Sequence, residues 1–78
     1  MEKRILTIPS MTNAIRGQEM LLRAGISAKI RKLSPQQDTH GCSQGIEIYR
    51  TDLDHALDLL SEAGIRITHI RGIKDDLS

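Results

Sequence analysis

The chain has 78 residues, a formal net charge of +1, one tyrosine and no Phe or Trp. This length favours a single domain with an aliphatic core, and a charge so near zero gives no bulk electrostatic argument for nucleic-acid binding. Cys42 is the only cysteine, which excludes an internal disulfide and the class of small disulfide-stapled secreted domains. No signal-peptide hydrophobic region and no apolar run of membrane length are found. We therefore expect one cytoplasmic domain spanning residues 1–78.

The first half of the chain predicts a strand, a helix and a second strand. Arg4–Ile8 is a short apolar run that stops at Pro9, as a central strand would. Ser10 is a residue type that caps helices, and Ala24-Gly25 is a typical helix end because glycine adopts the left-handed conformation. Alternation through Ile26–Leu33 predicts a half-buried strand whose charged positions suit a sheet edge. The helix has five apolar positions expected to face the core: Met11, Ala14, Ile15, Leu21 and Leu22.

The second half repeats this pattern. Gly45–Tyr49 predicts a third strand, and Thr51–Asp54 opens a second helix with a variant capping box and acids in its first turn. Ala63-Gly64 ends that helix, and Arg66–Ile73 predicts a fourth strand. Six residues are expected to face the core: Ile46, Ile48, Leu53, Ala56, Leu57 and Leu60.

The order of these elements is βαββαβ, and the two helix ends have similar sequences. This order is that of the ferredoxin-like fold, an α+β sandwich. Right-handed crossovers then give a four-stranded antiparallel sheet with both helices on one face.

The segment His40–Gly45 holds Cys42 among glycines and small polar residues. A cysteine kept for packing usually has apolar neighbours, whereas glycines let the backbone bend so that N–H groups face an anion. In the predicted topology, the loop between strands two and three lies at the same end of the sheet as Pro9, Ser10 and the start of the first helix. Because a helix N-terminus favours negative charge, a thiolate there has a lowered pKa and raised reactivity. Cys42 is thus the candidate reactive residue, with an incidental loop thiol as the alternative.

Other polar residues give weaker signals. His40 has the chemistry to act as a general base or to steady a thiolate, but an ordinary solvated histidine fits equally well. A metal site from Cys42, His40, His55 and His69 is not expected, because the topology separates these residues and zinc motifs need closely spaced pairs. Ser10 is expected mainly as a helix cap, with a secondary role in polarising the site.

Charged residues on the first helix and second strand have two possible roles. They either form a patch for an acidic partner or are solvated charges that protect an edge strand, and the second role is favoured. These residues are Arg16, Arg23, Lys29, Arg31 and Lys32. Ferredoxin-like RNA-binding domains stack bases on sheet aromatics, and with Tyr49 as its only aromatic residue the chain is not expected to bind nucleic acid.

Features along nearly the whole chain resemble a family of short bacterial proteins described as selenium/sulfur (Se/S) carrier protein-like. The matching features include Ile8-Pro9-Ser10, Ala24-Gly25-Ile26, Pro35, the Gly41-Cys42 pair before an apolar strand, and the ending Leu59-Leu60 to Gly64-Ile65; Ala14, Glu19 and Leu22 match as well. In the family a glycine often follows the cysteine directly, whereas here Ser43-Gln44 intervenes before Gly45.

The resemblance implies a carrier more than a stand-alone enzyme. The Cys42 thiol would accept sulfur or selenium as a persulfide or perselenide from a donor enzyme and pass it to an acceptor protein. We expect no bound cofactor or metal and no association with a membrane. The residues expected to line the site or stabilise the thiolate are Ser10, His40, Gly41, Ser43 and Gly45. The alternative is a non-catalytic regulatory or adaptor module that binds a ligand or forms a homodimer through a sheet face.

Overall fold

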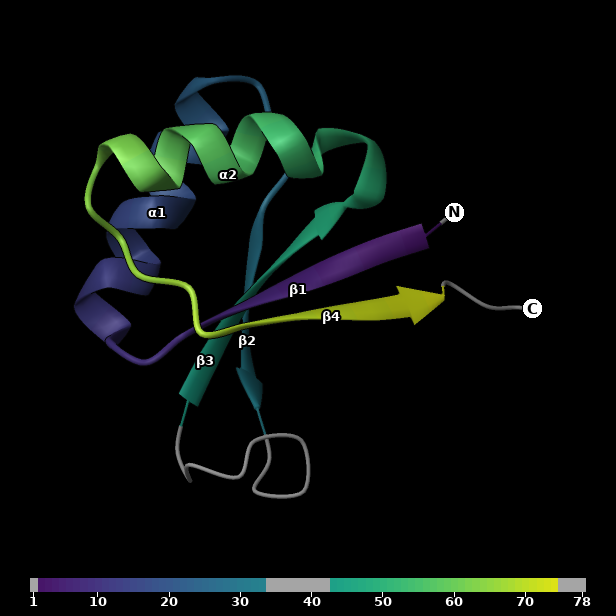
Figure 1. Cartoon of the computed structure of the whole chain (residues 1–78), viewed down its shortest axis with the longest axis horizontal. Helices are drawn as coiled ribbons and strands as arrows, with labels where there is room; N and C mark the ends of the chain where they lie inside the picture. Colours follow the sequence, from purple (N-terminus) through teal and green to yellow (C-terminus); the bar gives the residue numbers. More distant parts are fainter. Residues whose placement is uncertain (1, 34–42, 75–78) are drawn as a thin grey trace.

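The computed structural model describes residues 2–33 and 43–74, which form one sheet and two helices. The strands are β1 (Glu2–Ile8), β2 (Lys29–Leu33), β3 (Ser43–Tyr49) and β4 (His69–Lys74). The helices are α1 (Met11–Arg23) and α2 (Leu53–Glu62), the latter preceded by a 3₁₀ turn, η1 (Arg50–Asp52). The sheet is antiparallel with strand order β2-β3-β1-β4, and both helices cover one face of it (Figure 1). The predicted ferredoxin-like βαββαβ fold is confirmed, with β1 central and β2 at an edge.

Both helices end in the same hydrogen-bonded motif. The N–H of Gly25 bonds to Leu22 O (3.0 Å) and that of Ile26 to Leu21 O (2.8 Å), and Gly25 has φ +83°. In α2 the Ile65 N–H bonds to Leu60 O (3.0 Å), and Gly64 has φ +74°. These are Schellman motifs, in which glycine takes the left-handed conformation and the next apolar residue packs back on the helix.

The helix ends explain where the predicted strand boundaries were wrong. Strand β2 begins at Lys29 and not at Ile26, and β4 begins at His69 and not at Arg66. Ile26 gives its N–H to the end of α1 and buries its side chain in the core, so it belongs to the helix end and not to the ladder. The third strand is longer than predicted and begins at Ser43 instead of Gly45.

The side of α1 that faces the core also differs from the prediction. The buried residues of α1 are Ala14, Gly17 and Leu21, whereas Met11, Ile15 and Leu22 are exposed. Gly17 explains the difference, because a Cβ built there would lie 2.9 Å from Leu60 Cδ2. The missing side chain lets α2 approach α1 closely, so α1 turns its glycine side, and not its largest apolar residues, toward the core.

The start of α2 differs from the predicted capping box. Asp52 precedes the helix but makes no side-chain capping hydrogen bond, and the 3₁₀ turn η1 leads into the first α-helical turn instead. The predicted apolar face of α2 holds: Ala56 and Leu60 are buried, and Leu53 and Leu57 pack against the core from its margin.

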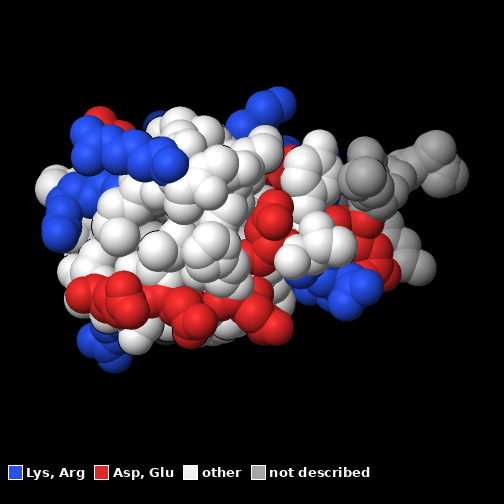
Figure 2. All heavy atoms as spheres, turned by 90° about the horizontal axis from the view of Figure 1, so that it is seen from above, with Lys and Arg blue, Asp and Glu red and all other residues white. Residues whose placement is uncertain are grey.

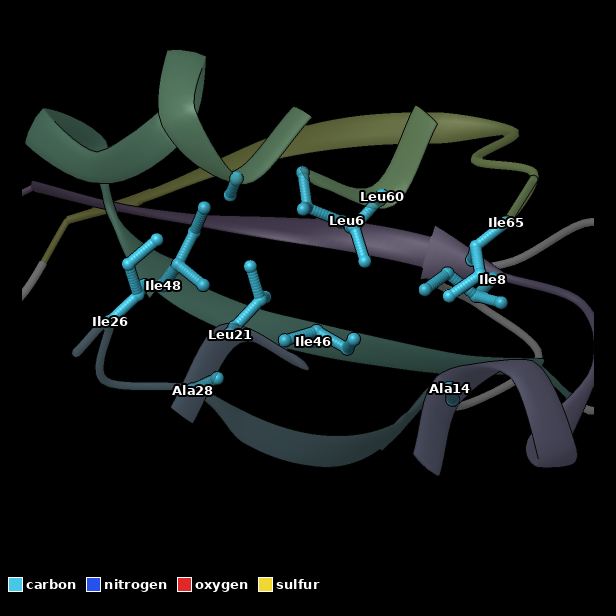
Figure 3. Close-up of a cluster of buried hydrophobic side chains, with 11 residues drawn as sticks. Leu6, Ile8, Ala14, Leu21, Ile26, Ala28, Ile46, Ile48, Leu60 and Ile65 are labelled. Atoms are coloured by element: carbon cyan, nitrogen blue, oxygen red, sulfur yellow. The ribbon is translucent and has the colours of Figure 1, made fainter. Parts of the chain in front are cut away.

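The core lies between the sheet and the helices (Figure 3). Leu6 and Ile8 of β1 and Ile46 and Ile48 of β3 point from the sheet toward the helices, as the alternation of the strands requires. Within residues 2–33 and 43–74, no helix is long and apolar enough to cross a membrane.

Candidate functional site

The residues predicted for the site divide into two groups. His40, Gly41 and Cys42 lie outside the described residues, whereas Ser10, Ser43 and Gly45 lie within them. Cys42 is joined by a peptide bond to Ser43, the first residue of β3. We therefore describe the residues around the start of β3, the strand to which the Cys42 segment is joined.

The start of β3 lies beside the end of β1. Gln44 pairs with Ile8 of β1 and with Lys32 of β2, and Ser43 pairs with Leu33. Ile8 is the last residue of β1, and only Pro9 and Ser10 separate it from α1. The first residues of β3 and the entry to α1 thus share one end of the sheet (Figure 1), as the topology predicted.

Gln44 fastens these two segments together. Gln44 is 7% exposed, and its Nε2 donates to Ile8 O at 3.4 Å and to Pro9 O at 3.3 Å. A buried amide that lost these acceptors would have an unsatisfied donor, so breaking the contact lowers the free energy of unfolding. The sequence predicts Gln44 only as a spacer between Cys42 and Gly45. The available signal was its place two residues before Ile46, on the side of the strand that faces the helices.

Ser10 is the N-cap of α1, as predicted. Its Oγ accepts from the Asn13 N–H at 3.3 Å, and its carbonyl accepts from the Ala14 N–H at 2.9 Å. The first turn of α1 contains no acidic residue. No carboxylate of that turn therefore offsets the partial positive charge of the helix N-terminus, which favours an anion at this end of the molecule.

Gly45 is a residue of β3 and not of the preceding segment. It is buried and pairs with Thr7 of β1 on one side and Arg31 of β2 on the other. Its backbone therefore runs through the sheet ladder between two strands.

The sheet face that the helices do not cover carries a charge cluster that was not predicted from the sequence. Glu47 is buried in the middle of this face, where Arg31 Nη1 lies 2.6 Å from Oε1 and Lys3 Nζ lies 3.0 Å from Oε2. Lys3 Nζ also stands 5.5 Å from the centre of the Tyr49 ring, a cation–π distance. A small pocket beside the cluster is lined by Lys3, Ser27, Lys29, Glu47, Ile48 and Tyr49. The signal in the sequence was an acid between two core isoleucines.

Glu47 gives stability a defined pH dependence. The hydrogen bond from Arg31 and the contact with Lys3 lower the pKa of its carboxyl from the ordinary 4.5, against the opposing effect of burial. A lowered folded-state pKa contributes stability above pH 4.5, and this contribution is lost as pH falls through the folded-state pKa. We expect Glu47→Gln to cost about 1–2 kcal/mol at pH 7 and markedly less at pH 3, measured by urea unfolding. Glu62→Gln, at an exposed position of α2, is the matched control, and an equal cost of Glu47→Gln at both pH values would contradict the assignment.

Of the histidines considered for a metal site, the two that the structure describes lie in different elements. His55 is in the first turn of α2, and His69 is the first residue of β4. Among residues 2–33 and 43–74, no group of three or more His, Cys, Asp or Glu side chains is arranged to hold a metal ion.

Comparison with known proteins identifies one family. The family model described as "Putative Se/S carrier protein-like" matches residues 3–71, which includes all of β1 but its first residue, both helices and the first half of β4. Comparisons with curated proteins and with solved structures found no significant match.

Proposed function

The chain belongs to the Se/S carrier protein-like family, and from this premise we propose that the thiol of Cys42 carries sulfur or selenium between two other proteins. A donor enzyme holding a persulfide is attacked by the Cys42 thiolate at the terminal sulfur. The donor's S–S bond breaks, the donor leaves as a thiolate, and a persulfide forms on Cys42. A nucleophile of the acceptor protein then takes the terminal sulfur and releases the Cys42 thiolate, so no external oxidant or reductant is consumed. Selenium transfer follows the same steps through a perselenide.

The observation that carries this proposal is the link between β3 and the entry to α1. Gln44 hydrogen bonds to the carbonyls of Ile8 and Pro9, and Ser10 caps a helix whose first turn has no acid. Cys42 is two residues before Gln44, and two extended residues span at most about 7 Å. This short tether supports a position for the thiol near the positive end of α1, where a thiolate is favoured.

Neighbouring residues have supporting roles in the proposed site. Ser10 and the first turn of α1 stabilise the thiolate, and the backbone of Gly41 and Ser43 approaches the carried atom from either side. His40 takes up or supplies a proton as the thiol changes state. A carrier of this kind works in the cytoplasm, where thiols are kept reduced.

The first test is the reactivity of Cys42. We expect alkylation by iodoacetamide to titrate with a pKa well below the ordinary 8.5, and the urea-unfolded chain to return to that value. Incubation with a small-molecule persulfide should add one sulfur atom to the folded protein, detected by mass spectrometry. Cys42→Ser should abolish this addition completely.

A thiol that reacts only after unfolding, or with a pKa at or above 8.5, would contradict the carrier mechanism. The non-catalytic binding module would then be the better account of the protein.

A further inference from the structure

Helix α1 exposes an apolar stripe. Four large hydrophobic residues are notably exposed in the described part of the chain, and three of them belong to α1: Met11 (45%), Ile15 (45%) and Leu22 (52%). Positions 11, 15 and 22 follow helical spacing and lie along one side of the helix, and we call these three residues the α1 stripe. Large apolar side chains gathered along one exposed side, and not scattered singly, are typical of interaction surfaces.

The α1 stripe runs along the outer margin of the helix layer. Gln18 lies on the same side of α1, and its Nε2 donates to Ala28 O at 3.1 Å, just before β2. This contact turns the stripe toward β2, an edge strand, and away from α2. Met11 directly follows the N-cap Ser10, so the stripe begins at the end of the molecule where β3 starts.

Positive charge borders this stripe. The exposed cations on this side of the molecule are Arg16 and Arg23 on α1 and Lys32 on β2. Lys29 and Arg31 of β2 are also exposed, but they alternate with Lys32 and face the side of the sheet where Glu47 lies. Glu19 is the one acid of α1. Helix α2 has the opposite character, because its exposed residues Asp54, Asp58 and Glu62 recur every fourth position. Figure 2 shows acidic side chains in a row along one margin of the helix-covered face.

The charges argue against a second copy of the chain as the occupant. Pairing of two β2 edges would bring the three cations of each strand together, the arrangement that natural edge strands use to prevent pairing. If α2 of another copy docked on the stripe, it would supply acidic residues but no row of exposed apolar side chains. The four notably exposed large hydrophobic residues of the described part of the chain are on α1 and β4.

We propose that the α1 stripe and its cationic borders bind an acidic amphipathic helix of a partner protein. The partner's apolar seam packs on Met11, Ile15 and Leu22, and its flanking carboxylates face Arg23 on one side and Lys32 on the other. Helix-on-helix packing fits a seam of helical spacing, and the charged β2 edge disfavours an added strand. Three half-exposed side chains make a small interface, so we expect the complex to be transient. This surface acts independently of the Cys42 thiol.

The test uses a synthetic helical peptide of about 18 residues, fluorescein-labelled, with a leucine seam flanked by glutamates. We expect saturable binding by fluorescence anisotropy that weakens with salt, and at least tenfold weaker binding of the same peptide with lysines in place of the glutamates. Ile15→Ser should weaken binding at least fivefold, as should the double variant Arg23→Glu with Lys32→Glu. Ile70→Ser is the matched control, because Ile70 is the exposed hydrophobic residue on β4 and should leave binding unchanged.

Cys42→Ser should bind the acidic peptide as well as the wild-type chain does, which separates this surface from the carrier chemistry. Circular dichroism confirms that each variant is folded. Equal binding of the two peptides, no saturable binding of the acidic one, or equal weakening by Ile15→Ser and Ile70→Ser would overturn the proposal. A wild-type dimer in sedimentation that Ile15→Ser converts to a monomer would overturn it in favour of a second copy.

Discussion

Replacing Gly17 with valine is expected to lower the free energy of unfolding by about 2–4 kcal/mol, a large share of the stability of a domain this small. A Cβ at this position already lies 2.9 Å from Leu60 Cδ2 and 3.2 Å from Ile46 Cδ1. Leu60 and Ile46 are both fully buried, so neither side chain moves without disturbing the packed core. The two γ-methyl groups of valine add further volume where no space exists.

Urea unfolding followed by circular dichroism measures this loss. Arg16→Val is the matched control: it places the same β-branched residue on the exposed side of the same helix, where helix propensity alone costs a few tenths of a kcal/mol. If the two variants lost equal stability, the close approach of α1 and α2 at Gly17 would not be the cause.

Replacing Gln44 with methionine is the second change with a large expected effect. The variant keeps most of the volume but removes the donor that bonds to Ile8 O and Pro9 O, so we expect a loss of about 1–3 kcal/mol. Under the carrier mechanism, the pKa of the Cys42 thiol should also rise, because the start of β3 is no longer fastened to the entry of α1. Iodoacetamide alkylation against pH measures the second effect in conditions where the variant remains folded.

Gln18→Met separates these effects. Gln18 also donates to a backbone carbonyl, Ala28 O, but at the other end of the helix layer from the start of β3. It should cost some stability and leave the alkylation profile of Cys42 unchanged. A shift of the Cys42 pKa in Gln18→Met equal to that in Gln44→Met would mean that general destabilisation, and not the position of β3, controls the thiol.

The order of the elements and most of the core were predictable because they depend on local patterns. Ile46 and Ile48 alternate as a half-buried strand requires, and Leu21 and Leu60 each precede a glycine helix end. The orientation of α1 was not predictable in the same way. Met11, Ile15 and Leu22 have helical spacing but face outward, because the close contact at Gly17 selects a different side. That contact depends on where Leu60 lies in space, which spacing along α1 does not encode.

The end of the sheet at which β3 begins was predictable, but the contacts made there were not. Topology alone put the segment before β3 at the same end as Pro9 and Ser10, and the Gln44 contacts agree with that end. The role of Gln44 was missed because a polar residue beside a glycine suggests a loop. Only the register shows that it belongs to the strand, facing the helices. The reactivity of Cys42 stays a prediction.

The central position of β1 sets the order in which the chain becomes structured as it is synthesised. Strand β1 leaves the ribosome first, yet its two neighbours in the sheet are β3 and β4, the last strands to be made. Until β4 emerges, one edge of β1 lacks its partner strand. The four-stranded sheet is therefore completed only after His69 and the rest of β4 have been synthesised. Until then the open edge of β1 can pair with other chains, so the unfinished protein is prone to aggregation.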